Sequence, residues 1–246
     1  MIFKSFIICA AALLSASGAQ SVELIVNGGF ESTTLDSSAE FGTRYPTQQV
    51  TGWTTSGYNF VFKSGTADTP GASGEYGNLK LWGPGDGAAN GLPAASPTGG
   101  NFIGADGAFN TLAINQTVTG LIAGQAATVS FYWAAAQQSG FTGATTEQWQ
   151  VSLGTETQKT AIVSNVDHGF SGWVKQSFTF TPTSSSAVLS FLAIGTPSGV
   201  PPFALLDGVS LTQDAVPEPA TWALLVTGFG MVGFAARRRR PATVTA

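Results

Sequence analysis

The sequence predicts an all-β fold, a two-sheet antiparallel sandwich, flanked by an N-terminal signal peptide and a C-terminal transmembrane helix. Over residues 20–216, apolar and polar residues alternate with period two in several short segments, and no run keeps apolar residues at helical spacing for three turns. Gly, Pro, Ser and Thr separate these segments, as is usual for turns between strands. Short strands at this spacing favour two sheets that enclose one core.

Residues 1–19 are predicted to form a secretory signal peptide. Lys4 precedes an apolar run over residues 6–14, and Ser17 and Ala19 occupy the −3 and −1 positions of a cleavage site. The apolar run is too short to span a bilayer, although a retained anchor is the alternative. The single cysteine of the chain lies within this segment, so the mature chain has no thiol to form a disulfide.

Residues 66–100 are predicted to form a long loop, because they are rich in Gly, Pro, Ala and Ser and contain few large apolar residues. Structureless loops of this length are uncommon in compact domains, so the segment is either functional or disordered. Tyr76 and Trp82 lie in it among polar side chains and are our candidates for a glycan-binding surface, since the apolar face of a sugar packs on aromatic rings. The alternative is that both rings tuck onto the sandwich.

The clearest predicted strand covers residues 174–180. Alternate residues from Val174 to Phe180 share one face and polar residues share the other, so we expect one face to be buried. Trp133 and Trp149 lie on strand faces that are otherwise apolar, and we expect both in the core. Further strands are expected to begin at 112 and to cover 129–134, 149–153, 188–194 and 203–211.

The composition excludes several classes of function. Residues 20–216 carry five basic and thirteen acidic side chains, a net charge of −8, which excludes nucleic-acid binding through phosphates. One His and no mature Cys cannot supply a zinc or iron–sulfur site. The sequence has no G-x-S-x-G motif, and no spacing singles out a carboxylate pair for glycoside hydrolysis. We therefore expect no enzymatic activity.

The C-terminal residues 215–240 have three parts. Pro217-Glu218-Pro219 is followed by an apolar stretch over residues 220–236 and then by Arg237, Arg238, Arg239 and Arg240. As a helix, the apolar stretch rises about 1.5 Å per residue and reaches about 25 Å, slightly less than a hydrocarbon core of about 30 Å. Arginines can extend to the interface, so we predict a membrane span with the arginines on the cytoplasmic side and the sandwich outside.

This tail resembles the PEP-CTERM sorting signal, in the variant with Trp222-Ala223 after Pro-Glu-Pro. The resemblance rests on Val216 to Ala223, the glycine-rich apolar run and the arginine cluster. It implies a Gram-negative bacterium, export across the inner membrane, which the C-terminal helix occupies before processing, and cleavage near Pro217-Glu218-Pro219 by an exosortase, a membrane transpeptidase. Such a signal is an address and assigns no activity.

The mature region, residues 20–214, resembles the galactose-binding-like jelly roll of many carbohydrate-binding modules. The resemblance rests on the order of short motifs along nearly all of the mature chain, and it implies a jelly-roll sandwich. The motifs are Leu24 to Glu31, Gly52-Trp53, Ile114 to Leu121, Gly172-Trp173 and Leu206 to Leu211.

This second resemblance also implies a structural calcium, formed by an acidic residue of the N-terminal motif and an Asp near the last strand. The matching positions are Glu31 and Asp207, with Asn27 as a further candidate, and such oxygen ligands suit Ca²⁺. In an unbroken strand Asp207 would point into the core together with Val209, at a high cost unless it is paired or metal-bound. The alternative is a bulge at Gly208 that rotates the carboxylate outward.

Together these observations predict an exported cell-surface or extracellular-matrix protein that binds extracellular polysaccharide. The alternative is a structural or adhesive surface protein without a specific glycan site, and a third hypothesis is a glycan hydrolase. A binding module would lose saturable glycan affinity on Trp82→Ala or Tyr76→Ala. A structural protein would show self-association or surface retention, and a hydrolase would release product from the polymer.

Overall fold

The computed structural model describes residues 21–214 and 219–238. The predicted signal peptide, residues 1–19, and Pro217, Glu218, Arg239 and Arg240 of the predicted sorting signal lie outside the described residues. Residues Glu23–Gln213 form one compact unit, and helix α1 (Pro219–Arg238) belongs to a separate unit. The compact unit contains its own hydrophobic cores, so we treat residues 20–214 as a domain that folds independently.

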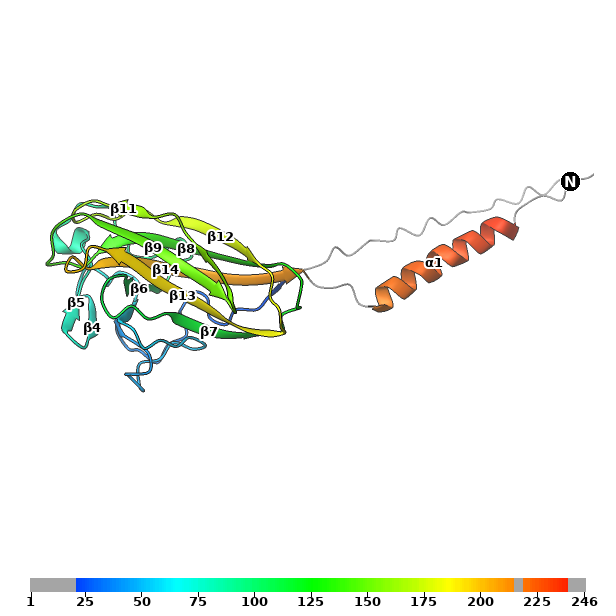
Figure 1. Cartoon of the computed structure of the whole chain (residues 1–246), viewed down its shortest axis with the longest axis horizontal. Helices are drawn as coiled ribbons and strands as arrows, with labels where there is room; N and C mark the ends of the chain where they lie inside the picture. Colours follow the sequence, from blue (N-terminus) through cyan, green and yellow to red (C-terminus); the bar gives the residue numbers. More distant parts are fainter. Residues whose placement is uncertain (1–20, 215–218, 239–246) are drawn as a thin grey trace, which may run out of the picture. The chain divides into compact units, whose positions relative to one another are not determined.

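The strands of the described residues form two sheets, which lie one over the other in Figure 1. The larger sheet contains β1 (Ser21–Glu23), β2 (Ala39–Glu40), β3 (Asn59–Phe62), β4 (Ala72–Gly74), β5 (Gly77–Leu79), β6 (Phe102–Asp106), β8 (Ala127–Gln137), β12 (Val174–Phe180) and β14 (Pro202–Asp214). The smaller sheet contains β7 (Ile114–Thr119), β9 (Thr145–Leu153), β10 (Glu156–Lys159), β11 (Val163–Asn165) and β13 (Ser186–Thr196). The predicted two-sheet sandwich is therefore confirmed.

Strand β14 is central to the larger sheet, whose order is β12-β8-β14-β6-β3-β2-β4-β5 with β1 also paired to β14. The smaller sheet has the order β10-β9-β13-β7, with β11 paired to β9. Leaving aside β1 with β14, the pairs in the described part of the chain are antiparallel apart from β2 and β4, which are parallel at Ala39 and Ser73. The purely antiparallel arrangement that we predicted thus fails at this one pair, where the chain returns to the sheet edge.

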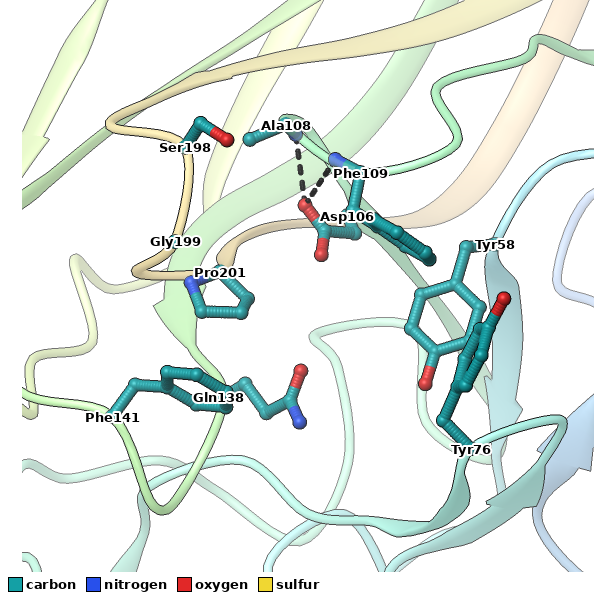
Figure 2. Close-up of a pocket in the computed structure, with 10 residues that line it drawn as sticks. All are labelled: Tyr58, Tyr76, Asp106, Ala108, Phe109, Gln138, Phe141, Ser198, Gly199 and Pro201. Atoms are coloured by element: carbon teal, nitrogen blue, oxygen red, sulfur yellow. Dashed lines mark hydrogen bonds between the residues drawn. The ribbon is translucent and has the colours of Figure 1, made fainter.

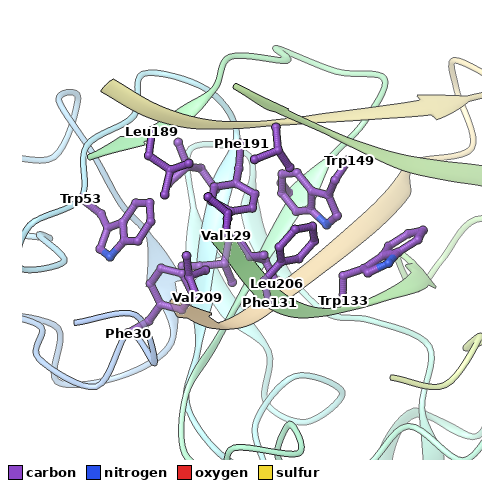
Figure 3. Close-up of a cluster of buried hydrophobic side chains, with 14 of the residues drawn as sticks. Phe30, Trp53, Val129, Phe131, Trp133, Trp149, Leu189, Phe191, Leu206 and Val209 are labelled. Carbon is purple, nitrogen blue, oxygen red and sulfur yellow. The ribbon is translucent and has the colours of Figure 1, made fainter. Parts of the chain in front are cut away.

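The main core lies between the two sheets and is built around aromatic side chains (Figure 3). The ring of Phe191 contacts Phe131 and Trp149 edge-on, at centroid distances of 5.1 and 6.0 Å. The Trp149 indole N–H also donates a hydrogen bond of 3.1 Å to the backbone carbonyl of Leu205. Trp133 and Trp149 are both buried, as predicted, because their strands expose alternate residues to the core.

The strand with the clearest sequence pattern, β12, lies at the edge of the larger sheet. Phe180 is buried in the core and Phe178 packs partly against it, whereas Val174 is exposed. The predicted apolar face is therefore buried at one end of the strand. Edge strands lack a neighbour on one side, which leaves the far end of this face uncovered.

A β-bulge at Gly208 reverses which side chains of β14 face the main core. The pairing of β14 with β8 shifts its register after Asp207, and Gly208 adopts a φ of 58°. Before the bulge Leu206 faces the main core and Leu205 the opposite side of the sheet, whereas after it Val209 returns to the main core. Asp207 therefore does not share a face with Val209, as an unbroken strand would require, and the predicted alternative of a bulge at Gly208 that turns Asp207 away from the main core is confirmed.

A second hydrophobic core covers the outer face of the larger sheet. Residues 66–100, which we predicted to be a long loop, contain β4, β5 and a 3-10 turn at Pro84–Asp86, and they carry Leu79, Leu81 and Leu92 into this core. The sheet contributes the side chains Phe60, Phe62, Phe102, Ala134, Ala136, Phe203 and Leu205. A few well-placed leucines are enough to fix the segment, and for that reason its low apolar content was misleading. We call residues 66–100 the cover.

The apolar C-terminal segment forms helix α1, which includes Pro219, Trp222, Ala223, Arg237 and Arg238 of the predicted sorting signal. We predicted that this helix spans the membrane. Among the described residues, the structure holds no helix with both the length and the apolar character needed for crossing a membrane.

The second core yields a test of whether the cover is part of the folded domain. Leu81 is fully buried, so Leu81→Ala should lower the free energy of unfolding by about 2–5 kcal/mol, through lost burial and the cavity that remains. Leu112→Ala, at an exposed leucine, is the control and should change it by less than about 0.5 kcal/mol. Urea denaturation of both variants measures this, and equal effects would contradict the packing of the cover on the sheet.

Candidate functional site

A cavity of about 450 Å³ lies among the loops next to β3, β6, β8 and β14 (Figure 2). Its walls come from segments far apart in the sequence, including the turn between β4 and β5 and the connection from β13 to β14. The side chains and backbone around it are those of Tyr58, Tyr76, Asp106, Ala108, Phe109, Gln138, Phe141, Ser198, Gly199 and Pro201.

One wall of the cavity is aromatic. The rings of Tyr58, Tyr76 and Phe109 contact one another, with centroid distances of 5.7, 5.4 and 5.5 Å. Tyr58 is buried and also packs edge-on against Phe60 of the second core at 4.6 Å, which fixes its position. Tyr76 and Phe109 are 65% and 46% exposed. Ring surface held open to solvent on a fixed base is what a binding site for an apolar ligand face requires.

Asp106 supplies a carboxylate beside this wall. One oxygen, Oδ1, accepts hydrogen bonds from the backbone N–H groups of Ala108 (2.8 Å) and Phe109 (3.0 Å), which fixes the turn after β6. The other carboxylate oxygen points into the cavity (Figure 2). Burial raises the pKa of Asp106 to about 6, and the two N–H donors oppose the rise. The same burial, with the charges of Glu40 and Asp106, raises the pKa of Tyr58 above its usual range.

The opposite wall contains Gln138 and Phe141. The amide of Gln138 extends into the cavity (Figure 2), and its backbone N–H donates to the carbonyl of Pro201 at 3.3 Å. Behind this wall, the Trp82 indole N–H donates a hydrogen bond of 2.9 Å to the carbonyl of Phe141, and its ring lies 3.9 Å from that of His168. Trp82 therefore supports the wall, whereas Tyr76 is part of the lining.

Of the two aromatic residues singled out in the sequence, the structure places Tyr76 in the cavity and Trp82 behind it. Sequence reasoning missed Tyr58, Asp106 and Phe109, because they lie in separate turns that only the fold brings together. A signal was present at Phe109, a large apolar residue within a short turn rich in Gly, Ala and Asn.

Two of the residues predicted to hold calcium, Glu31 and Asp207, lie near each other at a second place, beside the outer face of β14. Asp207 is fully buried, and its Oδ2 accepts hydrogen bonds from the hydroxyls of Ser96 and Thr98 in the cover. Its Oδ1 has no hydrogen-bond partner among the described residues. Burial raises the pKa of Asp207 to about 6. The hydroxyls of Ser96 and Thr98 and the backbone N–H of Gly208 oppose the rise, and the nearby charge of Glu31 adds to it. Glu31 itself accepts the backbone N–H of Asn101 at 2.7 Å.

Asn27 is not brought together with these two carboxylates. Its amide donates to the carbonyls of Ser32 and Thr51 at 3.0 Å, and its Oδ1 accepts the N–H of Ser32 at 2.9 Å, so the side chain holds its own turn. Within the described residues, no three His, Cys, Asp or Glu side chains gather where they could hold a metal ion. Glu31 and Asp207 would therefore need hydroxyl, carbonyl or water oxygens as further ligands.

The backbones of residue 28 and Val209 lie so close together that residue 28 must be Gly. The carbonyl of Gly28 accepts the N–H of Val209 at 2.9 Å, directly after the bulge in β14. A Cβ atom on Gly28 would collide with the carbonyl oxygen of Val209. This contact keeps the N-terminal segment, and with it Glu31, next to Asp207.

The comparisons with known proteins agree with the C-terminal signal. Residues 215–240 match the family model of the PEP-CTERM protein-sorting motif. Among curated proteins, none matches the chain. The chain thus carries a PEP-CTERM protein-sorting motif, which implies processing by an exosortase.

Several solved structures match this chain at low sequence identity. TmCBM61, solved in complex with β-1,4-galactotriose, is 14% identical with a TM-score of 0.43, over 78% of this chain and 99% of that one. The CBM22-1 xylan-binding domain of Paenibacillus barcinonensis Xyn10C is 14% identical with a TM-score of 0.38, over 76% and 97%. The K2 cleaved adhesin domain of Lys-gingipain is 16% identical with a TM-score of 0.38, over 81% and 100%.

Buried carboxyl groups give the domain a testable pH dependence. Burial raises the pKa of Glu147 to about 8, against which Thr145 donates one hydrogen bond. Between pH 4.5 and about pH 8 the folded state holds a proton that the unfolded state releases. The stability that this group contributes therefore falls as the pH rises, by about 1.4 kcal/mol per pH unit. Relative to Glu147→Gln, the wild type should therefore become less stable across this range.

The measurement is urea unfolding of residues 20–214 at several pH values with a chelator present. Glu156→Gln, at an exposed carboxylate, serves as the control and should follow the wild-type profile. A constant difference between the wild type and Glu147→Gln over the whole range would show that Glu147 titrates normally.

Proposed function

We propose that the domain binds extracellular polysaccharide in the cavity between the aromatic wall and Gln138. The observation that carries this proposal is the aromatic wall itself, with Tyr76 and Phe109 exposed on the fixed base of Tyr58 beside a buried carboxylate. The C–H face of a sugar ring would pack on Tyr76 and Phe109. Its hydroxyls would donate to Asp106 and exchange hydrogen bonds with Gln138.

The dimensions of the cavity suit one part of a polymer. A volume of about 450 Å³ falls within the range of small-ligand sites, roughly 300–1,000 Å³. Because the site is built from loops, the chain of a polysaccharide can extend beyond it on either side. The sorting motif supports the same proposal, because an exported protein meets polysaccharide at the cell surface or in the matrix of a Gram-negative bacterium.

A hydrolase would need more than this cavity offers. Glycoside hydrolysis uses two carboxyl groups on opposite sides of the scissile bond. Among the described residues that line the cavity, Asp106 supplies the one carboxyl group. The arrangement favours binding over cleavage, and product release from a bound polymer would contradict that inference.

The binding proposal predicts the effect of removing one exposed ring. Tyr76→Leu keeps apolar volume but removes the aromatic ring. It should weaken binding to the preferred glycan by about tenfold or more, since the stacking of a ligand ring on an aromatic side chain is worth on the order of 1–3 kcal/mol. Tyr132→Leu, at a half-buried tyrosine of β8 outside the cavity, is the control and should bind like the wild type.

Calorimetric titration of residues 20–214 with the host's exopolysaccharide and with neutral and acidic glycans measures this. Absence of binding to every glycan by a folded sample would favour the alternative, a structural or adhesive surface protein. Saturable binding that survives Tyr76→Leu would place the glycan site elsewhere on the domain.

We also propose that Glu31 and Asp207 hold a structural Ca²⁺. The support is the unpartnered Oδ1 of buried Asp207, next to a second carboxylate whose charge it senses. A cation would offset the like charges and satisfy that oxygen, and hard oxygen donors of this kind suit Ca²⁺. The ion would link the N-terminal motif, β14 and, through Ser96 and Thr98, the cover.

This second proposal predicts a calcium-dependent melting temperature. Calcium at about one hundred times its Kd should stabilise the native state by about 2.7 kcal/mol, which corresponds to a rise of several degrees in Tm. Asp207→Asn and Glu31→Gln should each reduce the rise, and Asp36→Asn, at an exposed carboxylate, should keep it. Thermal melts with calcium, magnesium or chelator measure the effect, and an unchanged Tm at saturating calcium would sink the proposal.

A further inference from the structure

We propose that the cavity selects glycans that carry a positively charged amine, such as glucosamine units with a free amino group. This inference rests on the proposed function and names the class of sugar that the same site prefers. It depends on the negative charge around the cavity, on the aromatic wall and on the carboxylate oxygen of Asp106 that has no positively charged partner among the described residues.

The charge around the cavity is negative. Among the described residues that line it, Asp106 is ionisable as an acid and none is Lys, Arg or His. Behind Tyr58 lies a second buried carboxylate, Glu40, which accepts the Tyr45 hydroxyl at 2.8 Å and whose charge acts on Tyr58 together with that of Asp106. The negative potential of these carboxylates attracts a cationic group that enters the cavity, and it repels a uronic acid or a sulfate.

The nearby arginine does not cancel this field. Arg44 pairs with Glu75 at 2.5 Å, next to Tyr76 in the turn between β4 and β5. That pair is exposed and has no net charge, so it leaves the carboxylates Glu40 and Asp106 without a positive counterpart at the cavity.

The aromatic wall offers a second attraction for a cation. Tyr58, Tyr76 and Phe109 lie within 5.7 Å of one another and leave ring surface open toward the cavity. An ammonium within about 6 Å of such ring faces is attracted by their quadrupoles, and more strongly where water is excluded. A neutral hydroxyl at the same place gains packing but not this electrostatic contribution.

An ammonium would also complete the bonding of Asp106. The carboxylate is almost fully buried, one oxygen already accepts two N–H groups, and the other faces the cavity without a positive partner in the described part of the chain. Burial raises the pKa of this carboxyl because the ionised form has lost its hydration and has no positive charge beside it. A cationic ligand would supply that positive charge. An ammonium carries three donor protons, and besides Asp106 the lining offers further acceptor oxygens in the side chains of Gln138 and Ser198.

The test compares three β-1,4-linked trisaccharides that differ at C2 alone: glucosamine with an amine, N-acetylglucosamine with an acetamide, and glucose with a hydroxyl. Titrations are followed by NMR on residues 20–214 at about pH 6.5, below the pKa of roughly 7.7–8.0 of an α-amino group and above the pKa of about 6 of Asp106. The amine-bearing trisaccharide should bind about tenfold more tightly than the other two, as expected for a charge-assisted hydrogen bond.

Asp106→Asn provides the decisive variant, because its amide oxygen can still accept the two N–H groups of the turn. It should weaken binding of the amine-bearing trisaccharide much more than binding of the glucose trisaccharide, and so remove the preference for the amine. Asp36→Asn changes the net charge equally at an exposed position outside the cavity and should keep the preference.

The outcomes separate this inference from the proposed function. Equal affinities for the three trisaccharides, all lost in Tyr76→Leu, would overturn the amine preference and leave glycan binding in place. An amine preference that persists in Asp106→Asn would also overturn it. Failure of the amine-bearing trisaccharide to bind overturns it as well, and if no other glycan binds, the proposed function falls with it.

Discussion

The bulge at Gly208 allows one central strand to serve two cores. Before it, alternate side chains of β14 place Leu206 between the sheets and Phe203 and Leu205 on the outer face; after it, Val209 and Leu211 face the main core. The extra residue also places Asp207 under the cover and brings the backbone of Gly28 against Val209. Removal of this irregularity would reverse one half of the strand, because a shift of one residue exchanges the two faces.

The second core fixes the position of the aromatic wall of the cavity. Tyr58 packs on Phe60, and Phe60 lies against Phe62 and Phe203 in the same layer. The aromatic wall is thus anchored to strands β3 and β14, although the cavity is lined largely by loops. A site with such a base loses little conformational freedom when a ligand binds, so more of the contact energy is available for affinity.

The sequence was most informative where local pattern decides structure. Period-two alternation located strands such as β9 and β14, and the C-terminal motif was recognisable from consecutive residues alone. The alternation alone left the face of Asp207 open between an unbroken strand and a bulge at Gly208, and the structure has the bulge. Most of the cover is irregular, in keeping with the predicted loop, but its packing was missed because a few leucines, spaced irregularly, bury it against a sheet that was not visible in the sequence.

The candidate site was partly visible in the same way. Tyr76 stood out in the sequence as an aromatic residue in a polar segment. Asp106 and Phe109 become candidate site residues only in the fold, where both line the cavity and Phe109 contacts Tyr58. Trp82 stood out equally, but its indole N–H donates a hydrogen bond to the backbone carbonyl of Phe141. Residue type and surroundings in the chain identified candidates, and long-range contacts decided their roles.

Under the proposed function, the cover also determines how a polymer can approach. It closes the outer face of the larger sheet, so a sugar chain that binds at the cavity touches the rim of loops and does not lie along strands. A short footprint of this kind limits the strength of each single contact. Firm attachment to a matrix would then come from many copies engaging one polymer, because linked weak contacts raise the overall avidity far above that of each site. Density on the cell surface, set by the sorting machinery, would therefore tune adhesion.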